Sequence, residues 1–163
     1  MSHARNKLGW CLRKAEKEGA RHRGIKIVSP SLEAANEHIE KAFHNLRVMP
    51  YLLDGSYPDW AVSAGFYAIY HSLLALLAKQ GYESRNQECT FAAVEVLIHE
   101  KKTSLTPEQV RKVFAFDNDF QDALSLRETF QYGTGVRLDL GVVKILKEDA
   151  QDILETAKRD LKS

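Results

Sequence analysis

The chain has 163 residues, of which 44% are hydrophobic and 28% are charged, and this size suits one domain with a sizeable core. Its formal net charge of +1 provides no overall attraction to nucleic acid. Its two cysteines, Cys11 and Cys89, form no CxxC motif and are too few for a disulfide framework, so we expect free thiols in a reducing compartment. The first residues carry charges where a signal peptide needs an apolar core, which predicts a cytoplasmic protein.

The N-terminal part, residues 1–30, is predicted to be an extension outside the main domain, residues 31–163. Apolar residues recur with helical spacing between Ala4 and Glu18, and a loop with a short extended piece follows. Residues 1–28 carry eight Lys or Arg against two Glu, a local charge of +6.

A basic segment of this kind is either a contact for nucleic-acid phosphates or a solvated helix face and loop. We expect the extension to add salt-dependent affinity for nucleic acid and to be dispensable for folding. The candidate phosphate-binding side chains in it are Arg13, Lys14, Arg21 and Arg23.

The main domain is predicted to begin with an amphipathic helix. Ser31 is a good helix cap, and apolar residues recur three and four positions apart from there to about Met49. Pro50 and the Asp54-Gly55 pair are expected to close this helix, because Pro and Gly commonly interrupt helices.

Residues 60–78 form the segment around which the other helices are predicted to pack. Nearly every residue in it is apolar or aromatic, and a helix that is apolar on almost every side is buried on almost every side. Ser56 as a cap and Pro58 in the first turn mark its start, and Gly81 marks its stop. The length would also suit a membrane span, but its polar side chains and the lack of a second such segment favour a soluble bundle with no membrane partner.

Further helices are predicted downstream, with no strand pattern longer than four residues. Thr106, Pro107 and Gln109 form a capping box that begins one of them. A break is expected near residues 117–119, and the Gly-Thr-Gly of residues 133–135 should end the next helix. The pattern therefore predicts an all-α, up-and-down bundle of four to five helices with an extra N-terminal helix. The downstream helices are expected at about 86–100, 106 to the break, 120–132 and 140–161.

Three stretches resemble parts of the HEPN domain family. Residues 64–77, AGFYAIYHSLLALL, resemble the central helix of that family, with its aromatic pair, its small residue and its Ala-Leu-Leu before a Gly. The turn at 54–57, Asp-Gly-Ser-Tyr, is similar to the connection before that helix, and residues 126–132 are similar to a late family signature that begins with Arg. The resemblance covers roughly residues 31–160. It implies a homodimer in which the Arg motifs of the two protomers form one basic cleft.

The chain departs from the family pattern at positions that include the expected catalytic His of the ribonuclease members. Ribonuclease members carry an Arg followed four to six residues later by a His, and Tyr132 stands at that point after Arg127. Glu128 follows the Arg where that branch often has a polar amide, and Cys89 stands where many relatives have a His.

Arg127 and Tyr132 are the candidate catalytic pair. Metal-free RNA cleavage needs a proton acceptor, a proton donor and positive charge on the phosphate. Arg127 supplies the charge, because its planar guanidinium matches phosphate oxygens, and Tyr132 is a poor base but can donate a hydrogen bond. If Arg127 holds a phosphate, its guanidinium should be partly exposed in a cleft. The alternatives are an ion pair for Arg127 and a core ring for Tyr132.

The remaining candidate residues give weaker indications of function. His71 is expected to be a hydrogen-bonded core residue, and the other histidines lack metal-ligand spacing, so neither a metal nor a cofactor is predicted. An aromatic cluster strengthens the expectation of a homodimer, because it offers more aromatic surface than one helix pair would cover. Its members are Phe114, Phe116, Phe120 and Phe130.

Three functions remain open on these grounds. The first is a subunit that binds nucleotide or RNA phosphate, partnered with a minimal nucleotidyltransferase in a toxin–antitoxin-like, two-component system, as the resemblance implies. The second is a metal-independent endoribonuclease toxin, and the third is a structural dimer without a ligand. The missing His favours the first function, and the retained Arg127 keeps the second open.

Overall fold

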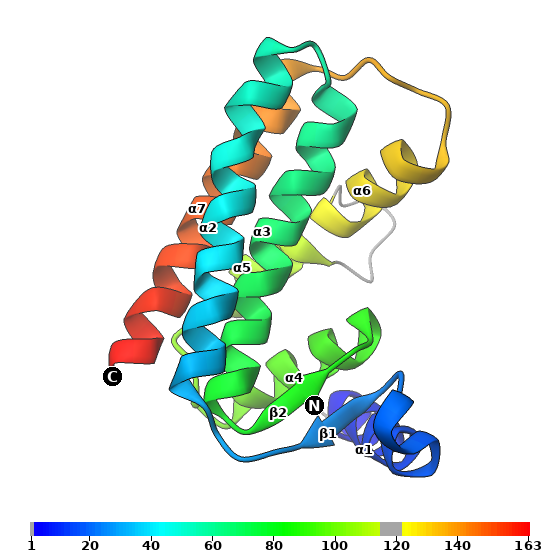
Figure 1. Ribbon diagram of the computed structural model, residues 1–163, viewed down its shortest axis with the longest axis vertical. Coiled ribbons are helices and arrows are strands. Elements are labelled where there is room, and N and C mark those ends of the chain that lie inside the picture. Colours follow the sequence, from blue (N-terminus) through cyan, green and yellow to red (C-terminus); the bar gives the residue numbers. More distant parts are fainter. Residues whose placement is uncertain (1, 115–121) are drawn as a thin grey trace.

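The computed structural model describes residues 2–114 and 122–163, and most of this chain is helical. Helices α2, α3 and α7 stand side by side, α6 lies beside α3, and α1 lies at the lower end (Figure 1). The elements are α1 (Ser2–Glu18), a 3-10 turn (Gly19–Arg21), β1 (Ile25–Ile27), α2 (Leu32–Asp54), α3 (Pro58–Lys79), β2 (Tyr82–Ser84), α4 (Gln87–His99), α5 (Pro107–Val113), α6 (Ala123–Tyr132) and α7 (Leu140–Lys162).

Helix α3 is the centre of the bundle, as its apolar sequence predicts. Helices α2, α6 and α7 pack against it, and its Phe66, Ile69 and Leu73 side chains have no exposed surface. Gly65 allows α7 to approach closely, because a Cβ there would lie 2.9 Å from Leu146 Cδ2. Helix α3 is long and apolar enough to cross a membrane, yet 78% of its most apolar window is buried inside the protein. The all-α bundle around a central apolar helix is confirmed.

Helix α2 begins as predicted and ends later. The Ser31 hydroxyl accepts a hydrogen bond from Ala34 N at 3.0 Å, which caps the helix. The helix then continues through Pro50 to Asp54, so the end expected near Met49 and Pro50 is wrong, whereas the Asp54-Gly55 pair does close the helix as predicted. A proline removes one backbone donor and weakens a helix, but packing of α2 along α3 outweighs that local cost.

The predicted cap of α3 is also wrong. Ser56 lies in the turn with a φ of 66°, and Tyr57 precedes the helix without a side-chain cap. Pro58 occupies the first turn as expected. At the other end Gly81 has a φ of +84°, and a Cβ there would lie 2.7 Å from Val28 O, so this stop signal is confirmed.

A two-stranded antiparallel sheet joins the N-terminal segment to the bundle. β1 pairs antiparallel with β2, with Ile25 opposite Ser84 and Ile27 opposite Tyr82. The extended piece in the N-terminal loop is thus confirmed, whereas its partner strand, Tyr82–Ser84, was not predicted. Three-residue strands carry too short a pattern to reveal a partner more than fifty residues away.

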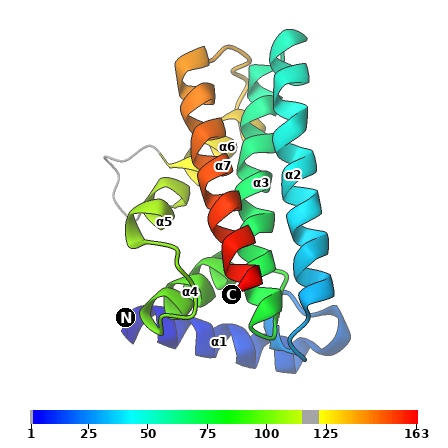
Figure 2. The same cartoon turned by 90° about the vertical axis from the view of Figure 1, so that its left-hand side faces the viewer.

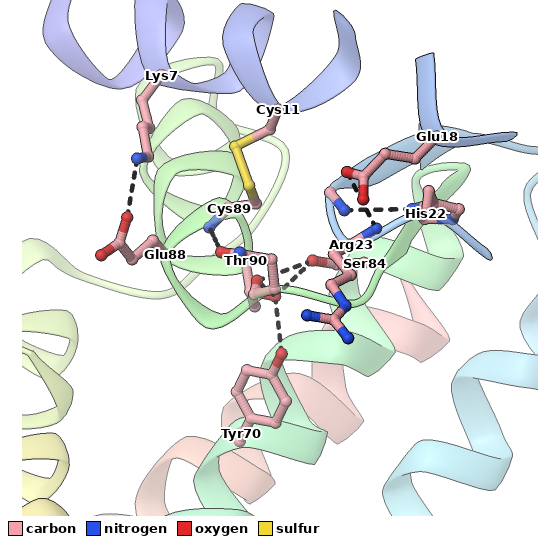
Figure 3. The surroundings of a disulfide bond; sticks show 12 residues. Lys7, Cys11, Glu18, His22, Arg23, Tyr70, Ser84, Glu88, Cys89 and Thr90 are labelled. Carbon is pink, nitrogen blue, oxygen red and sulfur yellow. Dashed lines mark hydrogen bonds and ion pairs between the residues drawn. A yellow bond between two sulfur atoms is a disulfide. The ribbon is translucent and has the colours of Figure 1, made fainter. Parts of the chain in front are cut away.

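The two cysteines form a disulfide, so the expectation of free thiols is wrong. Cys11 of α1 and Cys89 of α4 are bonded, with their Cα atoms 5.8 Å apart, and neither has exposed surface (Figure 3). The bond joins residues separated by 78 positions, a pairing that only the fold brings about. The two cysteines therefore no longer support the prediction of a reducing compartment.

Helix α1 packs as part of the same core. It lies across α4 at the lower end of the bundle (Figure 2), and its Ala4 and Leu8 are buried, as is Ile25 of β1. Removal of residues 1–28 would take away these buried apolar side chains, the disulfide and strand β1. We therefore now expect that truncation to destabilise the fold, contrary to the expectation from sequence.

The C-terminal half follows the predicted helices closely. The capping box at Thr106 and Gln109 is present, and Gly133 ends α6. Phe114 is buried and stacks on Phe91 with ring centroids 4.1 Å apart, so it does not contribute to an exposed aromatic surface. The predicted break near residues 117–119, and the side chains at 116 and 120, lie outside the described residues.

Candidate functional site

Arg127 is held inside the bundle by α6. Asp122 caps this helix by accepting a hydrogen bond from Ser125 N at 2.6 Å. Apolar residues of α6 face α3, and Arg127 shares that inward face with Leu126, so its side chain points at the aromatic side of α3. Only 4% of Arg127 is exposed, which contradicts the expectation of a partly exposed guanidinium.

Neutral groups surround the guanidinium. Nη1 donates to Gln131 Oε1 at 2.6 Å and to the Tyr67 hydroxyl at 3.4 Å, and Nη2 donates to Gln87 Oε1 at 3.3 Å. Cζ lies 4.8 Å from the Phe66 ring centroid, and 5.8 Å from that of Tyr67. Aromatic faces stabilise a desolvated cation, so these rings compensate part of the cost of burial.

The buried charge is not neutralised by a carboxylate among residues 2–114 and 122–163. No described Asp or Glu forms an ion pair with Arg127, so the alternative of a buried ion pair is not supported there. In addition, the buried Arg127 Nε has no hydrogen-bond partner among the residues that the structure describes. Buried charges are usually paired, and buried donors usually bonded, so this guanidinium has the capacity to accept an anion.

Tyr132 lies beside this charge and faces solvent. Its ring centroid is 6.0 Å from Arg127 Cζ, and the residue is 74% exposed. The alternative of a core ring is therefore wrong. On an ideal helix the two side chains would lie about 140° apart, but the long arginine side chain reaches the last turn, where Gly133 ends the helix. The guanidinium and the Tyr132 ring are thus neighbours near the C-terminal end of α6.

The structure places the other predicted residues elsewhere. Arg13 and Lys14 lie on α1, and Arg21 and Arg23 follow it, so these four side chains belong to the lower end of the molecule, away from α6 in Figure 1. Glu128 is exposed on α6.

His71 is hydrogen-bonded, as expected, but its partner was not foreseen. The Nδ1 atoms of His38 on α2 and His71 on α3 lie 3.0 Å apart, so one imidazole donates to the other. Burial lowers the pKa of His71 from 6.5 to about 4, with the nearby His38 and Lys41 as smaller causes. Burial also lowers the pKa of His38, against a smaller opposing effect of Glu37.

Sequence reasoning missed the neutral partners of Arg127. Gln131 could have been predicted from the sequence as a partner, because it follows Arg127 by four residues and therefore lies on the same helix face. Gln87, Phe66 and Tyr67 come from α3 and α4, and only the packing of three helices brings them to one guanidinium. Within the described residues, no group of three or more His, Cys, Asp or Glu side chains is placed to hold a metal ion.

These features define an all-α bundle in which a helix packed on the central helix carries a buried arginine with no carboxylate partner among the described residues. The sequence profile of the HEPN domain matches residues 35–162, which is most of the chain, and the chain therefore belongs to the HEPN domain family. Domains of this family are commonly ribonucleases or nucleotide-binding domains. A search of curated proteins found none that matches.

Proposed function

We propose that this HEPN protein binds a phosphate group of a nucleotide or of RNA on Arg127. The observation that carries the proposal is the buried guanidinium with an unpartnered Nε and no carboxylate partner among the described residues. Arg presents a planar fork of donors that suits phosphate oxygens, and an anion would neutralise a charge that is held only by amide oxygens and rings. Tyr132 is 74% exposed and its ring centroid lies 6.0 Å from Arg127 Cζ, so we propose that rotation of this side chain gives a phosphate access to the buried guanidinium.

The proposal extends to the assembly. The chain forms a homodimer in which two such sites face one cleft, and it acts in the cytoplasm as the helical partner of a minimal nucleotidyltransferase in a two-component, toxin–antitoxin-like system. The exposed position of Tyr132 at the site leaves room for a second protomer. Sedimentation at micromolar concentration tests the dimer, and a mass equal to the monomer contradicts it.

Metal-independent RNA cleavage is the second candidate function. A guanidinium and a phenol hydroxyl group supply charge and a hydrogen-bond donor, but neither titrates near pH 7 as a His does. The binding function is therefore preferred, and Tyr132→His tests the difference. This variant should gain cleavage of a short RNA in the presence of EDTA, with Phe at the same position as the matched control.

Titration calorimetry with ATP and with a short RNA tests the binding proposal directly. Arg127→Ala should weaken binding by about 1.5–3 kcal/mol, the contribution of one charge-assisted contact. Arg127→Lys should recover part of this loss, because a point charge replaces a fork. Unchanged affinity in both variants, with their folds intact, would show that Arg127 does not contact the phosphate. No binding of ATP or RNA by the wild type would leave the third function, a structural dimer without a ligand.

A further inference from the structure

The outward face of α1 carries a line of cations around an exposed tryptophan. Lys7, Trp10, Lys14 and Lys17 follow one another at spacings of three, four and three, which places them on one face of the helix. Trp10 is 45% exposed. Together with Arg13 and Glu18, the last three residues of the line form an open hollow of about 440 Å³. We call Lys7, Trp10, Arg13, Lys14 and Lys17 the Trp10 surface.

Two ammonium groups already lie on the indole ring. Lys7 Nζ is 4.5 Å and Lys14 Nζ is 5.2 Å from the Trp10 ring centroid. An exposed cation–π contact is weak, whereas a nucleobase stacked on an aromatic ring contributes more. A base that replaced one ammonium would therefore gain stacking, and the displaced Lys would be free to contact the adjacent phosphate.

The charges of this surface have few acidic partners. Among the residues that the structure describes, Arg13, Lys14 and Lys17 form no ion pair. Lys7 pairs with Glu88 at 2.8 Å, but the Glu88 side chain is 76% exposed and such pairs hold weakly (Figure 3). Positive charge thus surrounds the one aromatic ring, which is the combination that nucleic-acid strands bind.

The inner face of α1 keeps this surface in place. Ala4, Leu8 and Ala15 are buried, and Cys11 is bonded to Cys89 of α4. The apolar face of the helix is therefore occupied by the protein's own core and is not available for insertion into a membrane. The same anchoring presents Trp10 on a fixed helix, so little ordering is needed on binding.

We propose that the Trp10 surface binds single-stranded nucleic acid, with one base stacked on Trp10 and the flanking phosphates held by Arg13, Lys14 and Lys17. This surface lies outside the matched HEPN region, residues 35–162, and is separate from Arg127. It provides a second contact for an RNA strand and does not depend on the phosphate site of α6.

Tryptophan fluorescence reports on the stacking directly. The chain has two tryptophans, so a Trp60→Phe variant leaves Trp10 as the single emitter. Titration with a ten-residue oligouridine should quench this emission, and a DNA oligothymidine in parallel tells RNA from DNA. Binding of either strand with quenching supports the proposal. Binding of both strands without quenching would contradict the stacking of a base on Trp10.

Affinity measurements test the contribution of individual side chains to binding. In fluorescence anisotropy with a labelled oligouridine, Trp10→Ala should weaken binding roughly tenfold. The double variant Lys14→Gln, Lys17→Gln should lower the slope of log affinity against log salt by about 1.4, at 0.7 per lost phosphate contact. Lys144→Gln, an exposed change on α7, is the matched control and should leave both quantities unchanged.

Two further results would overturn the proposal. One is unchanged oligouridine affinity in both the Trp10 and the double lysine variants, with melting temperatures equal to that of the wild type. The other is binding to vesicles of phosphatidylcholine and phosphatidylserine in place of the oligonucleotides, which would make α1 a membrane-surface helix. Arg127→Met should retain Trp10 quenching, so loss of the α6 site is distinguishable from loss of this one.

Discussion

Two buried charges in this protein are held in opposite ways. Near the C-terminus of α7, Asp160 is 8% exposed and its carboxylate accepts three hydrogen bonds, from Thr103 Oγ1 at 2.6 Å, Ser104 N at 2.9 Å and Ser104 Oγ at 2.6 Å. On α6, Arg127 is 4% exposed, and its Nε has no hydrogen-bond partner among the described residues.

The difference separates a structural charge from a candidate binding charge. Asp160 ties the loop before α5 to the last helix, and its donors are matched to both carboxylate oxygens. Within the described residues, one buried donor of Arg127 has no partner, which costs stability and is consistent with the anion binding that we propose. Asp160 and the disulfide therefore stabilise the fold at the lower end of the bundle, whereas Arg127 on α6 is the charge that we propose binds an anion.

The largest expected effect concerns the disulfide. Replacement of both Cys11 and Cys89 by Ser should lower the free energy of unfolding by about 2–4 kcal/mol, because the bond closes a long loop in the unfolded chain. Urea denaturation measures this loss, and dithiothreitol should lower the midpoint of the wild type but not that of the variant. A midpoint that is the same with and without reductant would show that the lower end does not depend on this bond.

Asp160→Ala should cost about 3 kcal/mol. The substitution leaves the donors of Thr103 and Ser104 without their acceptor in a partly buried loop. Glu155→Ala on the same helix is the control, since its pair with Lys158 is exposed and should contribute under about 0.5 kcal/mol. Equal losses in the two variants would remove the contrast between Asp160 and a surface charge.

The His38–His71 pair gives a smaller effect that depends on pH. Because the pKa of folded His71 lies near 4 while that of the unfolded chain is 6.5, the unfolded state takes up the proton first as the pH falls. Stability contributed by the neutral pair is therefore present above pH 6.5 and is lost toward pH 4. Urea midpoints at pH 7, 6 and 5 should fall more steeply in the wild type than in His71→Gln, and parallel curves would contradict this assignment.

The smallest effects on stability are expected at Arg127 itself. Arg127→Met should change the free energy of unfolding by under about 1 kcal/mol, because apolar replacement of an imperfectly paired buried charge is often neutral. Gln87→Glu should stabilise the fold slightly, since it adds a carboxylate where Gln87 Oε1 now accepts from Nη2. Both variants should lose anion binding in calorimetry. A loss of several kcal/mol in Arg127→Met would instead make Arg127 a structural residue like Asp160.

The sequence by itself determined the helices and the central position of α3. Helical spacing, the Ser31 cap, the capping box at Thr106 and the stop at Gly81 act within a few residues, so a single chain reveals them. The motif around Arg127 was also visible in the sequence, as was the family to which the chain belongs.

Only the tertiary structure decided the contacts between distant residues. The Cys11–Cys89 bond, the pairing of β1 with β2 and the His38–His71 contact each join separate elements, and no local pattern encodes them. The continuation of α2 through Pro50 has the same cause, because packing along α3 outweighs a local helix breaker. The burial of Arg127 likewise depends on three helices at once, since a side chain's environment is set by what packs over it and not by its neighbours in the chain.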